Sequence, residues 1–153
     1  LPKVCLGTDH AGFRLKEEIA AFLRKKGYKI EDFGTYTEDS PDDYPDFIIP
    51  TAEAVAKSRG KAVGIIFGGS GLGECLAANK VPGIRAVAAY DRYTVKMSKL
   101  HNNANVLSLG SRTITGKSQV AKRLVKLWLE TKFSGDFRHQ RRLKKISDYE
   151  KRT

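Results

Sequence analysis

Short continuous apolar runs alternate along this chain with longer segments in which apolar residues recur about every three to four positions. Val4–Thr8 and Ala62–Phe67 are runs of the first kind, typical of strands that are buried on both faces. Ala11–Lys26 is of the second kind and is followed by Gly27, a residue that favours helix termination. The same criteria predict further strands at Tyr28–Phe33, Ile84–Ala89 and Val106–Leu109, and further helices over Asp46–Ser58, Glu74–Asn79, Asp91–Leu100, Gly116–Thr131 and Phe137–Tyr149.

This order of elements predicts an α/β fold. Each strand is followed by a segment long enough to cross over the sheet, which favours a mainly parallel five-stranded sheet with helices on both faces. Because such crossovers are right-handed, a doubly wound Rossmann- or flavodoxin-like arrangement is expected. No repeat, linker or low-complexity tract interrupts the pattern, so residues 1–153 are expected to form a single domain.

Composition narrows the class of protein. No apolar run approaches the length of a membrane span, and the first residues lead directly into a strand pattern, so neither an anchor nor a signal peptide is expected. Cys5 and Cys75 lie in separate elements without the CxxC spacing of a zinc site. Two thiols without a disulfide framework suit a reducing compartment, which indicates a cytoplasmic protein.

The net charge of +11 admits several kinds of anionic partner. Nucleic acid, an anionic membrane and a small anionic substrate all remain open on charge alone. Part of the excess is local, because residues 137–153 carry seven Lys and Arg against two acidic residues, which is 7 − 2 = +5. A solvated basic helix face is the simplest interpretation of that segment.

Unusual polar residues follow the predicted strands. Ligands of doubly wound sheets bind beyond the carboxyl ends of the strands, so residues at those points are candidates for a site. The candidates are Asp9-His10 after the first strand, Gly68–Gly73 with Glu74 after the third, Tyr90-Asp91-Arg92 after the fourth, Gly110-Ser111-Arg112 after the fifth, and His101-Asn102 at the end of the helix that follows the fourth. Their joint occurrence predicts one shared pocket.

The glycine-rich turn Gly69-Ser70-Gly71-Leu72-Gly73 is suited to hold an anion or an oxyanion on its backbone N–H groups. Its spacing is GxGxG instead of the dinucleotide GxGxxG, and no GK[ST] follows, so neither nucleotide motif is met. Structural alternatives stay open for each residue. The glycines can form a tight turn, Ser70 and Asp9 can cap helices, Glu74 can complement a helix dipole, and the histidines can be ordinary polar residues.

Several stretches together resemble the type B ribose-5-phosphate isomerases and their relatives that act on other aldose phosphates. The matching stretches occur in the family's order and cover nearly the whole chain: GTDHAGF (7–13), DYPDF (43–47), GGSGLGECLAANK (68–80), GIRA (83–86), HNNANVLSLGSR (101–112) and FRHQRR (137–142). No one stretch is specific, but the combination is.

The resemblance implies a role for each candidate residue. Arg112, Arg138 and Arg142, with His10 nearby, would hold the sugar phosphate, for which the planar arginine fork is well suited. His101 would assist ring opening, Asp9 would hold sugar hydroxyls and Tyr44 would line the pocket. Asn102 and the amides near Gly69, Gly71 and Gly73 would stabilise the enediolate oxygen, and His139 would support the phosphate or ring-opening end. In the family the C-terminal helix reaches a partner subunit, which implies a homodimer or a tetramer with its site at the interface.

The resemblance also implies where the catalytic base lies. One branch of the family has cysteine at the position of Gly68, and another has glutamate at the position of Glu74 with a serine equivalent to Ser70. This chain follows the second branch, so Glu74 is the expected base. Cys75 stays open as an alternative, because a thiol at a helix N-terminus can have a lowered pKa. Consecutive helical residues point about 100° apart, so Glu74 and Cys75 should not both face the substrate.

The implied reaction is the interconversion of ribose 5-phosphate and ribulose 5-phosphate, with no metal and no organic cofactor. Galactose 6-phosphate, allose 6-phosphate or erythrulose 4-phosphate would require nearly the same residues. A nucleotide- or RNA-binding domain is disfavoured because the basic segment offers only Phe137 and Tyr149 for base stacking, too far apart to form a platform. A flavodoxin-like electron carrier would have an acidic surface and a flavin loop after the first strand.

Overall fold

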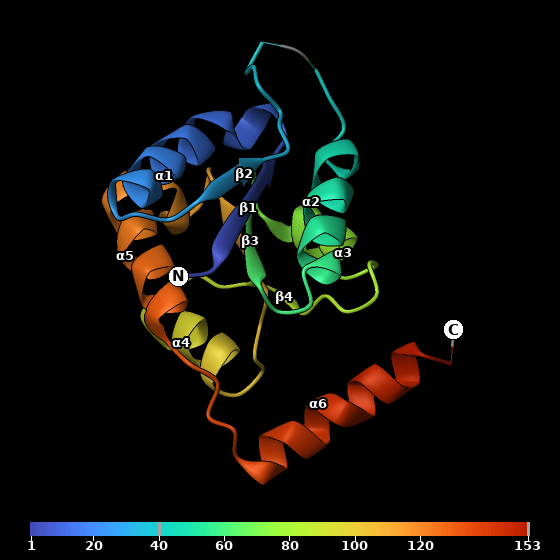
Figure 1. Cartoon of the computed structure of the whole chain (residues 1–153). Helices are drawn as coiled ribbons and strands as arrows, with labels where there is room; N and C mark the ends of the chain where they lie inside the picture. Colours follow the sequence, from blue (N-terminus) through green and yellow to red (C-terminus); the bar gives the residue numbers. More distant parts are fainter. Residues whose placement is uncertain (40, 153) are drawn as a thin grey trace.

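A computed structural model describes residues 1–39 and 41–152. Its five strands, β1 (Lys3–Thr8), β2 (Ile30–Asp32), β3 (Ala62–Gly68), β4 (Ala86–Ala88) and β5 (Val106–Gly110), form one sheet in the order β2-β1-β3-β5-β4 (Figure 1). All four strand pairings are parallel. The predicted α/β class and parallel sheet are therefore confirmed. The edge strands are β2 and β4, and β5 lies between β3 and β4.

Helices cover both faces of the sheet, as predicted (Figure 1). On one face α1 (Phe13–Lys25), α4 (Arg92–Leu100) and α5 (Ser118–Glu130) enclose a core built around Phe67, Leu107 and Trp128. On the other face α2 (Pro45–Lys57) and α3 (Leu72–Ala78) pack on Cys5 and Ile66. Two short 3-10 turns, η1 (His10–Gly12) and η2 (Ile114–Gly116), precede α1 and α5.

Local hydrogen bonds explain why α1 begins later than the sequence pattern predicts. The side chain of Asp9 accepts a hydrogen bond from the backbone N–H of Gly12 (3.2 Å) and thereby caps η1. The helix proper starts only at Phe13, two residues after the predicted Ala11. Asp9 is thus held at the carboxyl end of β1 by its own capping bond.

The direction of the chain across the sheet changes between β1 and β3. From β1 the chain moves outward to β2, then returns across the sheet to β3, so the strand order reverses between these two neighbours. Backbone hydrogen bonds from Ser111 N–H to Gly68 C=O (2.7 Å) and from Arg112 N–H to Gly69 C=O (2.9 Å) join the turns after β3 and β5. The Ser111 hydroxyl donates to the carbonyl of Ala11 (2.8 Å), which adds the turn after β1. Three turns therefore form one rigid edge where ligands of such sheets bind.

The C-terminal helix α6 (Phe137–Glu150) extends away from the sheet and its covering helices (Figure 1). His139 is its one buried residue, whereas Phe137, Ile146 and Tyr149 are 75%, 62% and 68% exposed. Within residues 1–39 and 41–152, none of the helices combines the length and apolar composition that crossing a membrane requires.

Candidate active site

Glu74 and Gly68 are in direct contact at the carboxyl end of β3. Glu74 stands in the first turn of α3, is 4% exposed, and folds back over Gly68. A Cβ atom built on Gly68 would lie 1.2 Å from Glu74 Oε1, so the carboxylate occupies the volume that any side chain at position 68 would need. Glycine at 68 is therefore required for the position of Glu74.

The environment of Glu74 favours a stronger base than an exposed glutamate. Burial raises the pKa of this carboxyl, the negative charge of Asp9 raises the pKa further, and a hydrogen bond from the backbone N–H of Glu74 opposes both. Loss of hydration makes a carboxylate a better proton acceptor, which is the direction that proton abstraction requires.

The glycine-rich turn leads directly into Glu74. Gly71 has φ +80°, a left-handed conformation that glycine adopts without strain, and its carbonyl accepts a hydrogen bond from the Ser108 hydroxyl (2.6 Å). The Ser70 hydroxyl accepts a hydrogen bond from the backbone N–H of Leu72 (3.1 Å). Ser70 therefore braces the turn before α3, although Gly71 occupies the N-cap position itself, and the Ser70 side chain is exposed.

Two predicted substrate-binding side chains pack on glycines of the same turn. A Cβ atom on Gly73 would lie 2.7 Å from Cζ of Tyr44, and one on Gly69 would lie 2.9 Å from Nη1 of Arg112. The missing side chains let an aromatic ring and a guanidinium approach the turn from two sides. The structure therefore brings together Tyr44, Arg112 and the turn, although they are far apart in the sequence.

Asp42 is a residue of this edge that sequence reasoning missed. Its Oδ1 lies 2.6 Å from Nδ1 of His10 and accepts a second hydrogen bond from the backbone N–H of His10 (3.1 Å). This interaction raises the pKa of His10 and favours the imidazolium form, a suitable phosphate ligand. One ligand atom each of Asp9, His10 and Asp42 lie within 4.8 Å of one another. We interpret this cluster as an ion pair beside a cap and assign no metal to it.

Cys75 follows Glu74 in α3 and is partly buried. It packs with the apolar cluster under α2 and α3 and contacts the amide of Asn79 (Nδ2 to Sγ, 3.7 Å). Burial raises the pKa of its thiol. This direction is opposite to the lowered pKa on which the alternative base was considered, and it favours Glu74.

The remaining predicted residues lie at the opposite edge of the sheet, so the prediction that His101 and Asn102 lie at the carboxyl edge is wrong. Helix α4 runs back across the sheet, so His101 and Asn102 at its end precede β5 instead of following a strand. Asn105, three residues later, accepts a hydrogen bond at its carbonyl from Gly64 N–H, near the start of β3. The seven residues of β3 separate the two edges by about 20 Å.

The start of α6 joins His101 at that amino edge. The rings of His101 and His139 lie 4.2 Å apart between centroids, and Ser134 contacts Nδ1 of His139 (2.7 Å). Burial first, and the proximity of His101 second, lower the pKa of His139. Arg138 and Arg142 lie on the same helix and are exposed. Within one chain these four side chains are thus remote from Glu74.

Comparison with known proteins shows which family has this sequence and this β2-β1-β3-β5-β4 sheet. A sequence model described as ribose/galactose isomerase matches residues 4–146. This chain belongs to the ribose/galactose isomerase family.

Similarity to members of the family extends over nearly the full length. Ribose-5-phosphate isomerase B of Escherichia coli is 40% identical, with 99% of this chain and 99% of that protein covered. The structure of ribose-5-phosphate isomerase B from Clostridium thermocellum matches with a TM-score of 0.92 and 46% identity, covering 98% of each chain. The Mycoplasma genitalium enzyme, solved with bound ribulose-5-phosphate, matches with a TM-score of 0.92 and 40% identity over 99% of this chain and 97% of that one.

Proposed function

We propose that this protein interconverts D-ribose 5-phosphate and D-ribulose 5-phosphate through ring opening and a cis-enediolate. Membership of the family supports this reaction, and so does a relative that binds ribulose-5-phosphate. The observation in this chain that carries the proposal is the buried carboxylate of Glu74, folded over Gly68 at the mouth of a glycine-rich turn. Residues 1–153 would act as one domain, and the free thiols of Cys5 and Cys75 favour the cytoplasm.

In the proposed mechanism the carboxyl edge binds the phosphate and the sugar. His10, kept cationic by Asp42, and the guanidinium of Arg112 contribute positive charge near the turn. Asp9 holds sugar hydroxyls and Tyr44 lines the pocket beside Gly73. Charge-assisted hydrogen bonds of this kind are the strong ones, so they fix the substrate for proton transfer.

Glu74 then moves a proton between two carbons. It removes the proton from C2 of the open-chain aldose and returns it to C1, while the hydroxyl proton passes between the two oxygens with help from Ser70. Backbone amides of Gly69, Gly71 and Gly73 stabilise the enediolate oxygen, each such donor contributing about 3 kcal/mol to the transition state. Once it has given the proton to C1, Glu74 is a carboxylate again. The reaction therefore consumes no oxidant or reductant.

We further propose that a second copy of the chain completes each site. Ring opening needs His101, the enediolate needs Asn102, and the phosphate needs Arg138 and Arg142 with His139 behind them, but these residues are about 20 Å from Glu74 in the same chain. A homodimer in which the amino edge and α6 of one copy meet the carboxyl edge of the other would unite the two groups. Two such dimers in a tetramer would preserve the arrangement.

Exposed apolar side chains support a second copy of the chain as the partner. Leu72 and Leu76 on α3, directly after the glycine-rich turn, are 57% and 63% exposed. Phe137 and Ile146 on α6 are equally unprotected, at 75% and 62%. Large apolar groups on two elements that both carry proposed site residues are expected at an interface between copies.

A coupled assay on ribose 5-phosphate tests the reaction. Glu74→Gln should lower kcat by about 100-fold or more with little change in KM, because the side chain stays isosteric and only the base is lost. Cys75→Ala is the matched control and should stay within about threefold of the parent. The proposal fails if the two results are reversed. Galactose 6-phosphate and allose 6-phosphate in the same assay identify the preferred sugar.

Mixing two inactive variants tests the shared site. Glu74→Gln and His101→Asn each inactivate both sites of their own homodimer, but a mixed dimer has one site with both lesions and one intact. Random exchange of subunits should therefore restore about a quarter of the parental activity. If the mixture stays as inactive as its components although exchange is demonstrated by a mass tag, each site belongs to a single chain.

A further inference from the structure

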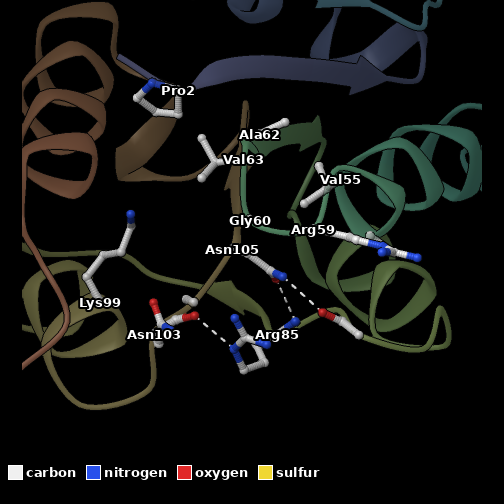
Figure 2. Close-up of a pocket in the computed structure, with 13 residues that line it drawn as sticks. Pro2, Val55, Arg59, Gly60, Ala62, Val63, Arg85, Lys99, Asn103 and Asn105 are labelled. Atoms are coloured by element: carbon white, nitrogen blue, oxygen red, sulfur yellow. Dashed lines mark hydrogen bonds between the residues drawn. The ribbon is translucent and has the colours of Figure 1, made fainter. Parts of the chain in front are cut away.

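A second cavity lies at the amino edge of the sheet, away from the proposed catalytic turn. Its volume is about 440 Å³, within the range of small-molecule sites. It is enclosed by the ends of α2 and α4, the start of β3, and the segments that precede β1, β3, β4 and β5 (Figure 2). None of the residues assigned a role in the isomerase reaction lines this cavity.

Positive charge surrounds this cavity. Arg59, Arg85 and Lys99 are among its lining residues, and no acidic side chain is. Among residues 1–39 and 41–152, none of these three cations has a carboxylate within ion-pair distance, although Glu150 lies near enough to oppose the lowering of the Arg85 pKa. Elsewhere in the chain, buried Lys16 is paired with Asp32 (2.5 Å). Arg85 and Lys99 are partly buried and Arg59 is exposed, so the cavity presents positive charge that no neighbouring carboxylate of the described ranges neutralises by direct contact.

Lys99 is the most informative of the three. Its amine stands 4.4 Å from the centroid of the buried Trp128 ring, and burial lowers the pKa of the amine. An apolar side chain at position 99 could cover the Trp128 ring without removing a charged amine from water. In Figure 2 the amine end of Lys99 extends toward the Pro2 side of the cavity. A partly dehydrated ammonium that faces an open cavity attracts anions more strongly than one in bulk water.

Arg85 is held in place by its own hydrogen bonds. Its Nε donates to the carbonyl of Asn103 (2.8 Å), and its backbone N–H donates to Oδ1 of Asn105 (2.7 Å) (Figure 2). The Asn105 amide also donates to the carbonyl of Gly83 (2.9 Å). This network fixes the guanidinium through Nε and leaves its two Nη groups available for a bidentate contact.

The rest of the lining is mostly apolar. Pro2, Val55, Ala56, Ala62 and Val63 contribute carbon surface between the cations. A site with an apolar floor and cationic walls is suited to an organic molecule with one or more phosphate groups. An inorganic anion would contact only the cationic side chains and would leave the apolar surface uncovered.

We propose that this cavity binds a phosphorylated small molecule, with its phosphate held by Lys99 and Arg85 and a second anionic group near Arg59. The proposal does not depend on the isomerase reaction, since its site is about 20 Å from Glu74 across β3. Direct binding measurements can therefore fail or succeed independently of activity.

Isothermal titration calorimetry with inorganic pyrophosphate tests the site in the full-length protein. The background is Arg112→Met/Arg142→Met, which removes one proposed catalytic phosphate ligand from each edge of the sheet and leaves Arg138 and His10. In this background pyrophosphate should still bind, with one site per chain. Lys99→Met, which keeps the cover over Trp128, should weaken that binding at least about tenfold because a charged hydrogen bond is lost. Arg59→Asn, a residue that tolerates the left-handed backbone at φ +52°, should weaken it less.

Lys96→Met is the matched control, because Lys96 is exposed on the same helix and loses the same charge. It should change the affinity by less than about twofold. Absence of pyrophosphate binding in the Arg112→Met/Arg142→Met background overturns the proposal. So does equal weakening by Lys96→Met and Lys99→Met, which would indicate general attraction to a basic surface.

Discussion

Replacement of Gly68 by alanine should inactivate the protein through Glu74. The added Cβ would lie 1.2 Å from Oε1 and 2.1 Å from the carboxyl carbon of Glu74. Ordinary contacts of a Cβ atom begin at 3.4 Å, so the nearer oxygen must retreat by at least 3.4 − 1.2 = 2.2 Å. Position 68 does not have the positive φ that would itself exclude alanine. The clash with Glu74 is thus the dominant effect.

The size of the loss follows from this displacement. A misplacement of about 1 Å in a reacting group can cost about 100-fold in rate, and loss of a general base costs about 100- to 10,000-fold. Gly68→Ala should therefore reduce kcat by about 100-fold or more, approaching Glu74→Gln. Unfolding in urea should change little, because alanine restricts the unfolded chain by about 0.4–1 kcal/mol and offsets part of the native-state cost.

A double-mutant cycle separates this cause from a general disturbance of β3. In a Glu74→Ala background the space at position 68 is open, so adding Gly68→Ala should change kcat by less than about twofold. Gly68→Cys in the same background would place a thiol where the carboxylate was, and should recover part of the activity at high pH. Full activity of Gly68→Ala, or additive losses in the cycle, would refute the assigned place of Glu74.

Three further predictions concern charges near the site and in the fold. Because burial raises the pKa of Glu74, kcat should fall as the pH decreases through a midpoint above that of an exposed glutamate, and a pH–kcat profile with an ordinary midpoint would contradict this. Asp42→Asn removes the partner that raises the pKa of His10, so the rise in KM as His10 loses its proton should begin at lower pH, and an unshifted pH–KM profile would exclude Asp42 as a positioning residue. Lys16→Met leaves Asp32 without its buried partner and should cost about 3–5 kcal/mol in urea unfolding, with a smaller loss when Asp32→Asn is already present.

The fold could be predicted from the sequence because its signals are periodic and local. Apolar runs locate all five strands, and the predicted helix over Phe137–Tyr149 differs by one residue from α6. Boundaries shift where side chains decide the local structure, as Asp9 does at η1. The predicted strand at Tyr28–Phe33 shortens to Ile30–Asp32, since Lys26 and Gly27 form a turn and the pairing with β1 begins only at Ile30.

The site was less accessible to sequence reasoning because it depends on contacts between distant segments. Nothing in the loop before Tyr44 marks Asp42 as the partner of His10. The overlap between Gly68 and Glu74 likewise appears only once the helix is placed. For His101 a signal did exist, because a helix that crosses back over a parallel sheet must end at the amino edge. We predicted the end of this helix at the carboxyl edge, together with residues that follow strands.

That error changes how the basic C-terminal segment is interpreted. If His101 lay beside Glu74, one chain would contain a complete pocket, and α6 would be a solvated basic helix with an exposed Phe137 and Ile146. With His101 at the opposite edge and in ring contact with the buried His139, the same helix carries exposed arginines beside an ordered histidine pair. Ser134 contacts His139 and holds this arrangement in place, yet the apolar residues of α6 stay uncovered. Contact with a second copy of the chain accounts for such residues better than exposure to solvent does. The positive charge of α6 then lies where a phosphate from the other half-site would be bound.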